Sequence, residues 1–420
     1  MMPDWLRLLL TRRMLICVLT GFSSGMPLYL LLNLLPAWLR SESVDLKTIG
    51  LFALIQFPYT WKFVWAPLLD RYRPPLGRRR GWMLLSQIGL LASIGLLGGL
   101  SPADNLTAIV WLSVALAFLS ATQDIALDAF RREILSDQEL GLGNSVHVNA
   151  YRVAGLVPGS LSLILADLLP WAQVFWITAA FMLPGMIMAL LVAEPAVFGA
   201  PKTLRQAVVE PFHEFISRRG WSGALLVLGF IFLYKLGDSL ATALSTPFYL
   251  DLGYSKTDIG VIAKHAGLWP AVFGGLLGGL WMVRLGINRA LWLFGVVQWV
   301  TILGFSWLAW RGVQTSIDGL DRAALAGVIA AEYLGVGLGT AAFTAFIARA
   351  TNPAFTATQF ALFTSLAAVP RTFINAGAGA LVEAVGWFSF FIICFVLAAP
   401  GMALLLRVAP WNETPPSPQP

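Results

Sequence analysis

Long apolar stretches, separated by short polar segments, recur along the whole chain. An α-helix rises 1.5 Å per residue, so about 20 apolar residues cross the roughly 30 Å hydrocarbon core of a bilayer. This spacing predicts twelve transmembrane helices, over residues 14–39, 49–69, 82–100, 106–129, 141–165, 173–194, 221–248, 258–280, 290–310, 323–349, 358–382 and 387–408. We therefore expect an all-α polytopic membrane protein, with the lipid bilayer as one of its partners.

The amino-acid composition supports this prediction and argues against several classes of protein. Of 420 residues, 58% are hydrophobic and 12% are charged, whereas soluble domains carry about 25% charged residues. This argues against a soluble enzyme and against a nucleic-acid-binding protein, because the net charge of +6 need not form a basic surface. Cys17 and Cys394 lie in apolar stretches and indicate neither a disulfide framework nor a metal site. We expect no cofactor.

Positively charged residues lie mainly in one set of alternating loops. Eighteen Lys and Arg side chains fall on the side that holds both termini, and five fall on the opposite side. Because short loops rich in Lys and Arg stay in the cytoplasm, both termini are predicted to be cytoplasmic. Residues 1–13 are too short for a cleaved signal, so the first helix is expected to remain.

The two halves of the chain carry matching features. The basic turn APLLDRYRPPLGRRRGW at 66–82 corresponds to GLWMVRLGINR at 279–289, and ALDAFRR at 126–132 corresponds to TAFIARA at 344–350. These correspondences predict two pseudo-symmetric six-helix halves. Their expected boundaries are 1–194 for the first half, 195–220 for a cytoplasmic linker, 221–408 for the second half and 409–420 for a disordered tail.

This architecture resembles the major facilitator superfamily, and so does the loop after the second helix. DRYRPPLGRRRGW is similar to that superfamily's gating signature, in which an Asp and several Arg bridge helices on the cytoplasmic side. The resemblance implies gating roles for Asp70, Arg71, Arg79 and Arg80, with Arg284 in the equivalent loop of the second half. Asp70 would pair across the bundle in one state and release in another. The alternative is that these Arg only keep a short loop in the cytoplasm.

Ionisable residues inside the predicted helices carry the strongest functional signal. Each costs about 2.5–3.5 kcal/mol at a helix centre, so each should face a partner or a water-filled space. Nine are present: Lys62, Asp124, Asp128, Arg152, Lys235, Asp238, Lys264, Glu332 and Arg371. Arg152 and Arg371 both lie midway along their helices, one in each half, where two guanidinium groups would hold carboxylates bidentately.

The remaining buried charges suit an anionic solute that is carried with protons. Lys235 and Asp238 are three residues apart on one helix, so they can pair, and such a pair can also simply neutralise itself. Asp124 and Asp128 are four residues apart, and Glu332 is isolated, which makes these carboxyls candidates for proton binding. Lys264 can instead extend to the outer surface.

Several of these segments resemble the muropeptide permeases known as AmpG. The likeness spans nearly the whole chain and is carried by SATQDIALDAFRREIL at 120–135, KFVWAPLLDRYRPPLGRRRGW at 62–82, LYKLGDSLA at 233–241 and YRVAG at 151–155. It implies a proton-driven importer of GlcNAc-anhydromuramyl peptides in the bacterial inner membrane. These cell-wall fragments are recovered for recycling and sensed in β-lactamase induction. The matching positions are Gln123, Asp124, Asp128, Tyr151, Arg152, Lys235 and Asp238.

Together, the buried charges and the resemblance assign roles to individual residues. Substrate binding is expected at Arg152, Arg371, Lys235, Lys264, Lys62, Gln123 and Tyr151, and proton coupling at Asp124, Asp128, Asp238 and Glu332. Sugars would stack on aromatic residues such as Trp61, Trp65 or Tyr234, which are equally suited to packing or to facing lipid. We expect a monomer that works by alternating access.

Three other interpretations remain open. Related eukaryotic proteins carry acetyl-CoA, so another bulky anion is the alternative substrate. A membrane-embedded enzyme is the rival from another class, but GFSSG at 21–25 lies within a predicted membrane helix rather than a strand-to-helix turn. GVGLGT at 335–340 likewise lacks the strand that precedes a dinucleotide-binding loop. A channel would not concentrate its solute, whereas a symporter would.

Overall fold

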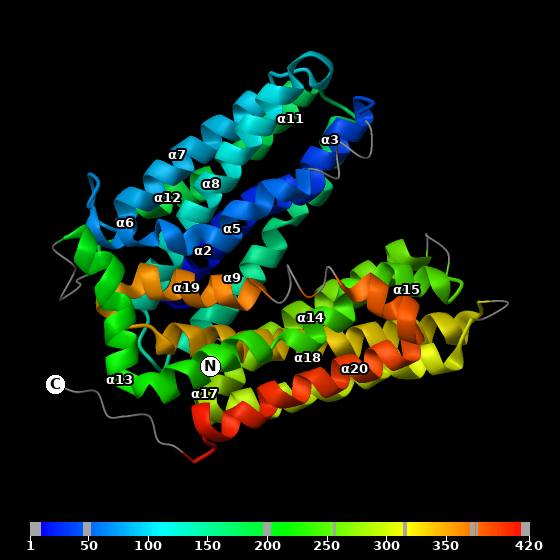
Figure 1. The fold of residues 1–420 in the computed structure, drawn as a ribbon. Coiled ribbons are helices and arrows are strands. Elements are labelled where there is room, and N and C mark those ends of the chain that lie inside the picture. The colour runs from blue at the N-terminus through cyan, green and yellow to red at the C-terminus, as the bar shows by residue number, and fades with distance from the viewer. Residues whose placement is uncertain are drawn as a thin grey trace, which may run out of the picture. The chain divides into compact units, whose positions relative to one another are not determined.

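The computed structural model describes residues 10–44, 52–195, 203–254, 258–313, 317–369, 374 and 377–412, which form helices and no β-strand (Figure 1). The elements up to residue 191 are α2 (Arg12–Tyr29), η1 (Leu30–Leu34), α3 (Leu35–Ser41), η2 (Phe52–Gln56), α5 (Phe57–Trp61), η3 (Lys62–Val64), α6 (Ala66–Arg71), α7 (Arg80–Leu97), α8 (Pro102–Ile134), α9 (Leu140–Ala154), η4 (Val157–Leu161), α10 (Ser162–Ala166), α11 (Trp171–Ala180) and α12 (Leu183–Leu191). Those that follow are α13 (Leu204–Leu233), α14 (Leu236–Ala243), α15 (Ser245–Asp251), η5 (Ile259–Ala263), α17 (Lys264–Arg311), α18 (Gly319–Ala350), η6 (Pro353–Phe355), α19 (Thr356–Val369) and α20 (Ala378–Val408).

Nine helical stretches within the described residues are long and apolar enough to cross a membrane. One of them, Val261–Arg311, covers most of the predicted span 258–280 and all of the predicted span 290–310. Gly286 separates these two, with φ +74° and ψ 165°, a backbone conformation that residues with a Cβ atom rarely adopt. The predicted span 49–69 is built from the short elements η2, α5, η3 and α6, and the span 358–382 begins in α19. The prediction of an all-α polytopic membrane protein is confirmed.

Proline and the residues around it explain why the second predicted span is interrupted. Pro58 and Pro67 occupy the first turns of α5 and α6. Proline has no backbone N–H and cannot continue the hydrogen bonds of a preceding helix, so it starts a new one. The short 3₁₀ segment η3 between them carries Lys62, which is 7% exposed. The interruption therefore places a lysine inside the protein.

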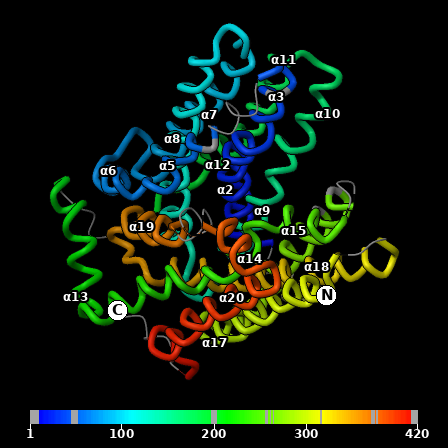
Figure 2. The backbone as a smooth tube through the Cα atoms, turned by 45° about the vertical axis from the view of Figure 1, so that its right-hand side comes forward, coloured from blue at the N-terminus to red at the C-terminus, as the bar shows by residue number. Residues whose placement is uncertain are grey.

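The chain divides into two compact units, each assembled from discontinuous segments. Unit 1 contains Met1–Ser136, Val146–Glu214 and Thr351–Ser365. Unit 2 contains Asp137–Ser145, Phe215–Ala350 and Leu366–Pro420. Helix α8 crosses unit 1, with a kink at Asn105 near its beginning, and packs along α7 (Figure 2). The beginning of α19 belongs to unit 1 although it lies late in the sequence.

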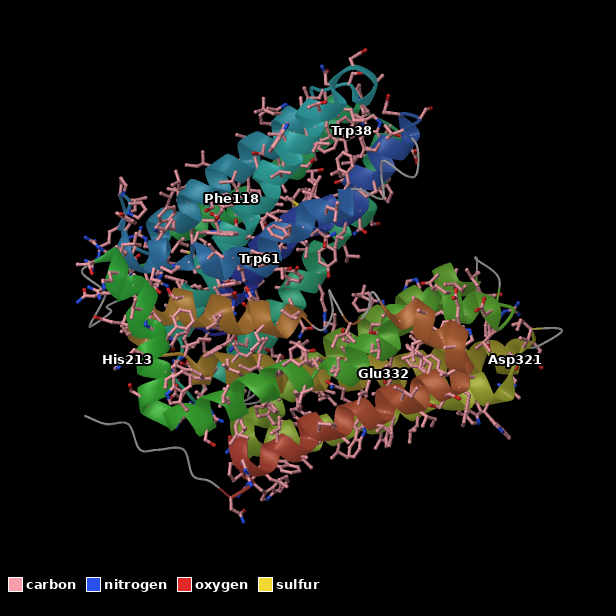
Figure 3. All side chains as sticks on the ribbon, in the orientation of Figure 1. Trp38, Trp61, Phe118, His213, Asp321 and Glu332 are labelled. Atoms are coloured by element: carbon pink, nitrogen blue, oxygen red, sulfur yellow. The ribbon has the colours of Figure 1, made fainter. Side chains whose placement is uncertain are left out.

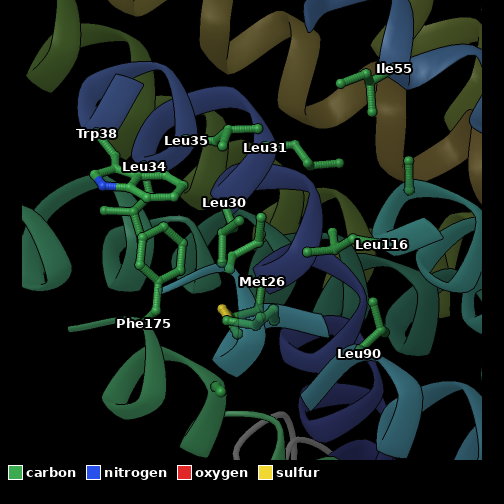
Figure 4. Close-up of a cluster of buried hydrophobic side chains, with 14 of the residues drawn as sticks. Met26, Leu30, Leu31, Leu34, Leu35, Trp38, Ile55, Leu90, Leu116 and Phe175 are labelled. Atoms are coloured by element: carbon green, nitrogen blue, oxygen red, sulfur yellow. The ribbon is translucent and has the colours of Figure 1, made fainter. Parts of the chain in front are cut away.

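Each unit has its own apolar core. In unit 1, Trp38 packs its ring against Phe175, with 4.9 Å between ring centroids, beside Met26, Leu90 and Leu116 (Figure 4). In unit 2 the core is a cluster of aromatic rings, which comprises Phe248, Phe305, Phe390, Phe391 and Trp387. Inside a bilayer, association of helices depends on such close packing because lipid tails are as apolar as the side chains.

Glycines allow α2 and α9 to approach closely within unit 1. A Cβ atom added at Gly21 or Gly25 would collide with the backbone carbonyl oxygen of His147 or Tyr151, respectively. The two glycines are four residues apart and therefore lie on one face of α2. This contact fixes the position of the α9 segment that carries Tyr151 and Arg152.

We expect a Gly25→Ala variant to be less stable by about 2 kcal/mol, the usual cost of forcing an extra methyl group into packed backbone. Thermal unfolding of the detergent-purified protein measures the effect. Gly229→Ala is a matched control, because its added Cβ would lie 3.8 Å from Leu404, an ordinary contact. Equal melting temperatures for the two variants would contradict the close approach of α2 and α9.

Candidate functional site

Four charged side chains form a cluster inside unit 1. Lys62 Nζ lies 3.7 Å from Asp128 Oδ2, and Arg131 Nη2 lies 2.8 Å from Asp128 Oδ1. Ser24 Oγ donates a hydrogen bond of 2.6 Å to Asp124 Oδ1. The two carboxylates stand one helical turn apart on α8, so they share a face of the helix. Two cations and two carboxylates leave this cluster without net charge when all four are ionised.

Three other predicted residues of unit 1 lie on the helices around this cluster. Gln123 is fully buried, and its amide donates a 2.7 Å hydrogen bond to the carbonyl oxygen of Ser23, which fastens α8 to α2. The ring of Tyr151 packs against Tyr29 with 5.5 Å between centroids. Tyr151 and Arg152 are both half-buried on α9.

A second group of polar side chains lies inside unit 2. Lys235 Nζ is 2.7 Å from Asp238 Oδ2 and donates a 2.7 Å hydrogen bond to Gln298 Oε1. Asp238 and Gln298 are 4% exposed. Glu332 of α18 is completely buried within the helices of this unit (Figure 3). Asp238 and Lys235 both act electrostatically on Glu332, so the structure brings together three of the predicted residues of unit 2.

Lys62, which is buried, and Lys235, which is half-buried, both lie at interruptions in a helix. Lys62 is in η3, between α5 and α6, and Lys235 is at the break between α13 and α14. The carbonyl and N–H groups of the broken turn are then available to polar neighbours, which is how membrane proteins tolerate irregular backbone. Two further predicted residues cannot be placed: Arg371 lies outside the described residues, and so does the side chain of Lys264.

The loop between α6 and α7 is organised by buried ion pairs. Arg79 Nη2 lies 2.8 Å from Asp70 Oδ1 and 2.6 Å from Glu133 Oε1, and Arg78 Nη2 lies 3.2 Å from the same Glu133 oxygen. Burial opposes the charge on Arg79, but Glu133 and Asp70 outweigh that effect, so the pKa of Arg79 is raised and the guanidinium stays charged. Arg78, Arg79 and Asp70 are all nearly inaccessible to solvent.

Asp70 also binds the first turn of α19. Its carboxylate accepts hydrogen bonds from the backbone N–H of Ala357 (3.3 Å) and of Thr358 (2.9 Å), and from the Thr358 hydroxyl (2.7 Å). The first N–H groups of a helix have no partner within the helix, and the helix dipole favours a negative charge there. Asp70 therefore joins the last turn of α6 to a helix that begins 286 residues later in the sequence.

The other predicted gating residues have different surroundings. Arg80 donates to the carbonyl oxygens of Ala189 (2.9 Å) and Leu190 (2.6 Å) at the end of α12. Arg71 is half-buried and its guanidinium lies 5.6 Å from the ring centroid of Tyr72. Arg284 is exposed on α17, two residues before the break at Gly286.

Sequence reasoning did not identify several residues that complete these networks. They are Ser24, Glu133, Glu194, Gln298 and Thr358. Glu194 accepts hydrogen bonds from the backbone N–H groups of Arg79 (2.8 Å) and Arg80 (3.1 Å), and so caps α7. Glu133 follows two arginines in FRREI, and this local charge pattern was the available signal for it. Ser24, Gln298 and Thr358 are uncharged, and each lies far in sequence from the residue that it binds, so they gave no such signal.

The three aromatic residues considered for sugar stacking differ in exposure. Trp61 is 41% exposed and stacks on Phe57, with 5.3 Å between ring centroids. Trp65 donates a 3.1 Å hydrogen bond to the Thr122 hydroxyl. Tyr234 is 3% exposed, and its hydroxyl donates to the carbonyl oxygen of Leu291 at 2.9 Å. Trp65 and Tyr234 thus have partners within their own units, and Trp61 retains an accessible face.

Comparison with known sequences and structures gives one consistent result. Residues 17–373 match the sequence profile of the Major Facilitator Superfamily. An Escherichia coli K12 anhydromuropeptide permease is 42% identical over 410 residues, which cover 97% of this chain and 82% of that protein. An uncharacterized Haemophilus influenzae protein is 52% identical over 407 residues, 96% of each chain. The proton:xylose symporter XylE has the same fold, with a TM-score of 0.68 at 11% identity over 94% of both chains.

Proposed function

Because the chain belongs to the AmpG-type muropeptide permeases of the major facilitator superfamily, we propose that it imports anhydromuropeptides together with protons by alternating access. The transported molecules are GlcNAc-anhydroMurNAc-peptides, and their uptake serves cell-wall recycling. The E. coli permease, aligned over nearly the whole of this chain, is the observation that carries the substrate assignment.

The multi-pass fold and the family place the protein in the inner membrane. We propose that both termini are cytoplasmic, as the distribution of Lys and Arg predicts. The halves 1–194 and 221–408 would then move relative to each other about the linker 195–220. The network of Asp70, Arg79 and Glu133 would lie on the cytoplasmic side, where its hydrogen bonds to α19 have to break for the protein to open inward.

The buried charges support an anionic substrate. Muropeptides carry lactyl and peptide carboxylates, for which Lys62, Arg152 and Lys235 supply cationic partners, and Arg371 would add a fourth. Asp124, Asp128, Asp238 and Glu332 are carboxyls that can gain or lose a proton as the surroundings of these cations change. Each unit holds at least one lysine beside such a carboxyl, and this arrangement links substrate charge to protonation.

Uptake into proteoliposomes tests the proposal directly. We expect labelled anhydromuropeptide to accumulate when the outside is acidic relative to the lumen, and to reach only equilibrium when a protonophore removes the gradient. If the substrate accumulates to the same level with and without the proton gradient, symport is contradicted. Labelled acetyl-CoA is the substrate control, and its uptake in place of the muropeptide would overturn the substrate assignment.

A further inference from the structure

The side-chain amide of Gln298 forms hydrogen bonds with both residues of the Lys235–Asp238 ion pair in unit 2. Its Oε1 accepts a hydrogen bond from Lys235 Nζ at 2.7 Å, and its Nε2 donates to Asp238 Oδ1 at 3.3 Å. The same Nε2 lies 3.5 Å from the carbonyl oxygen of Tyr234. Lys235 and Asp238 also contact each other directly at 2.7 Å. One uncharged side chain on α17 thus holds a lysine and an aspartate of the α13–α14 segment together.

Two glycines of α18 lie close to Gln298, Gly339 beside its amide group and Gly335 beside its backbone. A Cβ atom added at Gly339 would collide with Gln298 Oε1, and one added at Gly335 would lie 3.0 Å from the Gln298 Cα and from the Thr301 hydroxyl. Gly335 and Gly339 are four residues apart, on one face of α18. The amide therefore has little freedom to turn, and its acceptor oxygen stays directed at Lys235.

Glu332 lies on the same helix and differs from every other carboxyl predicted to couple protons. It is 0% exposed, and neither carboxyl oxygen makes a well-formed hydrogen bond among the described residues, although the Thr301 hydroxyl lies close enough to act on the carboxyl group. The titratable groups that interact with it electrostatically are Lys235, Asp238, Tyr249 and Cys394. The lysine is already neutralised by the aspartate. Burial disfavours an ionised carboxylate that has no ion pair among the described residues, so this arrangement favours the neutral, protonated form of Glu332.

We propose that Glu332 binds the coupled proton and that Gln298 is a positioning residue, which keeps Lys235 on Asp238 while Glu332 is protonated. When the Glu332 carboxyl releases its proton to water, Lys235 leaves Gln298 and Asp238 and pairs with the new carboxylate. Asp238 then keeps the Gln298 amide as its donor. A proton taken up from the opposite side neutralises Glu332 and returns Lys235. This proposal rests on the proposed symport function and identifies its proton-binding group.

Two transport assays on the full-length protein in proteoliposomes distinguish substrate exchange from proton coupling. Counterflow exchanges labelled for unlabelled anhydromuropeptide and needs no net proton movement, whereas gradient-driven accumulation does. We expect Glu332→Gln to retain counterflow and to lose accumulation at least tenfold. If wild-type protein itself fails to accumulate substrate, the symport function is wrong. If wild type accumulates and Glu332→Gln accumulates equally, the assignment of the proton to Glu332 is wrong.

The pH dependence of counterflow tests Gln298. Without the amide, Lys235 is freer to stabilise an ionised Glu332, so Gln298→Leu should move the alkaline fall in activity to lower pH by about one unit. Gln87→Leu is the matched control, because Gln87 is a fully buried amide of unit 1 without a hydrogen-bond partner among the described residues. An unchanged profile in Gln298→Leu would show that Gln298 only fills space.

Infrared spectroscopy of purified protein keeps the proposal testable if a variant folds poorly. Wild-type protein at neutral pH should show the carbonyl band of a protonated carboxyl, and Glu332→Gln should remove it. If that variant is not recovered, Glu332→Asp should shift the band. A band that neither substitution affects would overturn the assignment.

Discussion

An Asp70→Asn variant is expected to fold and reach the membrane, but to lose about tenfold or more of its transport activity. The Asp70 carboxylate accepts hydrogen bonds from Arg79, from two backbone N–H groups of α19 and from the Thr358 hydroxyl. Asparagine offers one acceptor oxygen, and its amide NH₂ would face donors. Hydrogen bonds to charged groups contribute about 1.5–3 kcal/mol each, and a shift of 1.4 kcal/mol changes a conformational equilibrium tenfold. The conformation in which the end of α6 is bound to α19 should therefore become much less populated.

Counterflow and thermal unfolding together test this expectation. Asp104→Asn is the matched control, because Asp104 is an exposed aspartate in the first turn of α8. We expect the control to transport like wild type and to melt at the same temperature. If Asp70→Asn also transports like wild type, the loop arginines serve only to orient the loop in the membrane, and the gating role of Asp70 is wrong.

The transmembrane architecture was predictable because the solvent imposes it. A helix must satisfy its own backbone hydrogen bonds in lipid, so runs of apolar residues indicate spans with few alternatives. The interruption in the predicted span 49–69 was not foreseen, although Pro58 and Pro67 were visible signals for it. That interruption matters, because it positions Lys62 inside unit 1.

The partners of the charged residues were much less predictable than the residues themselves. The cost of a charge in lipid drew attention to Lys62, Asp124 and Glu332 directly from the sequence. Asp70 was expected to pair across the bundle, but its partner Thr358 lies 288 residues away and has an uncharged side chain. Gln298 escaped notice for the same reason, since an amide in an apolar helix gives no charge signal. Specific pairing depends on how helices pack, which hydropathy does not encode.

Replacing Lys62 with methionine is expected to have the second large effect. The free energy of unfolding should fall by about 3 kcal/mol, and transport activity should be lost as well. The cluster of Lys62, Arg131, Asp124 and Asp128 is neutral when all four side chains are ionised. Removing the lysine leaves one carboxylate uncompensated, and breaking a buried ion pair by removing one partner costs about 3–5 kcal/mol. Thermal unfolding and counterflow measure the two losses separately.

A double variant distinguishes charge balance from lost packing. Lys62→Met combined with Asp124→Asn restores a neutral cluster, so it should recover most of the stability lost in Lys62→Met alone, with a favourable coupling energy of about 1–3 kcal/mol. Transport should stay low in the double variant, because Lys62 is proposed to bind the substrate carboxylates. If Lys62→Met melts like wild type, the lysine is not needed to balance the carboxylates of α8. If the double variant also transports like wild type, Lys62 has no part in binding the substrate.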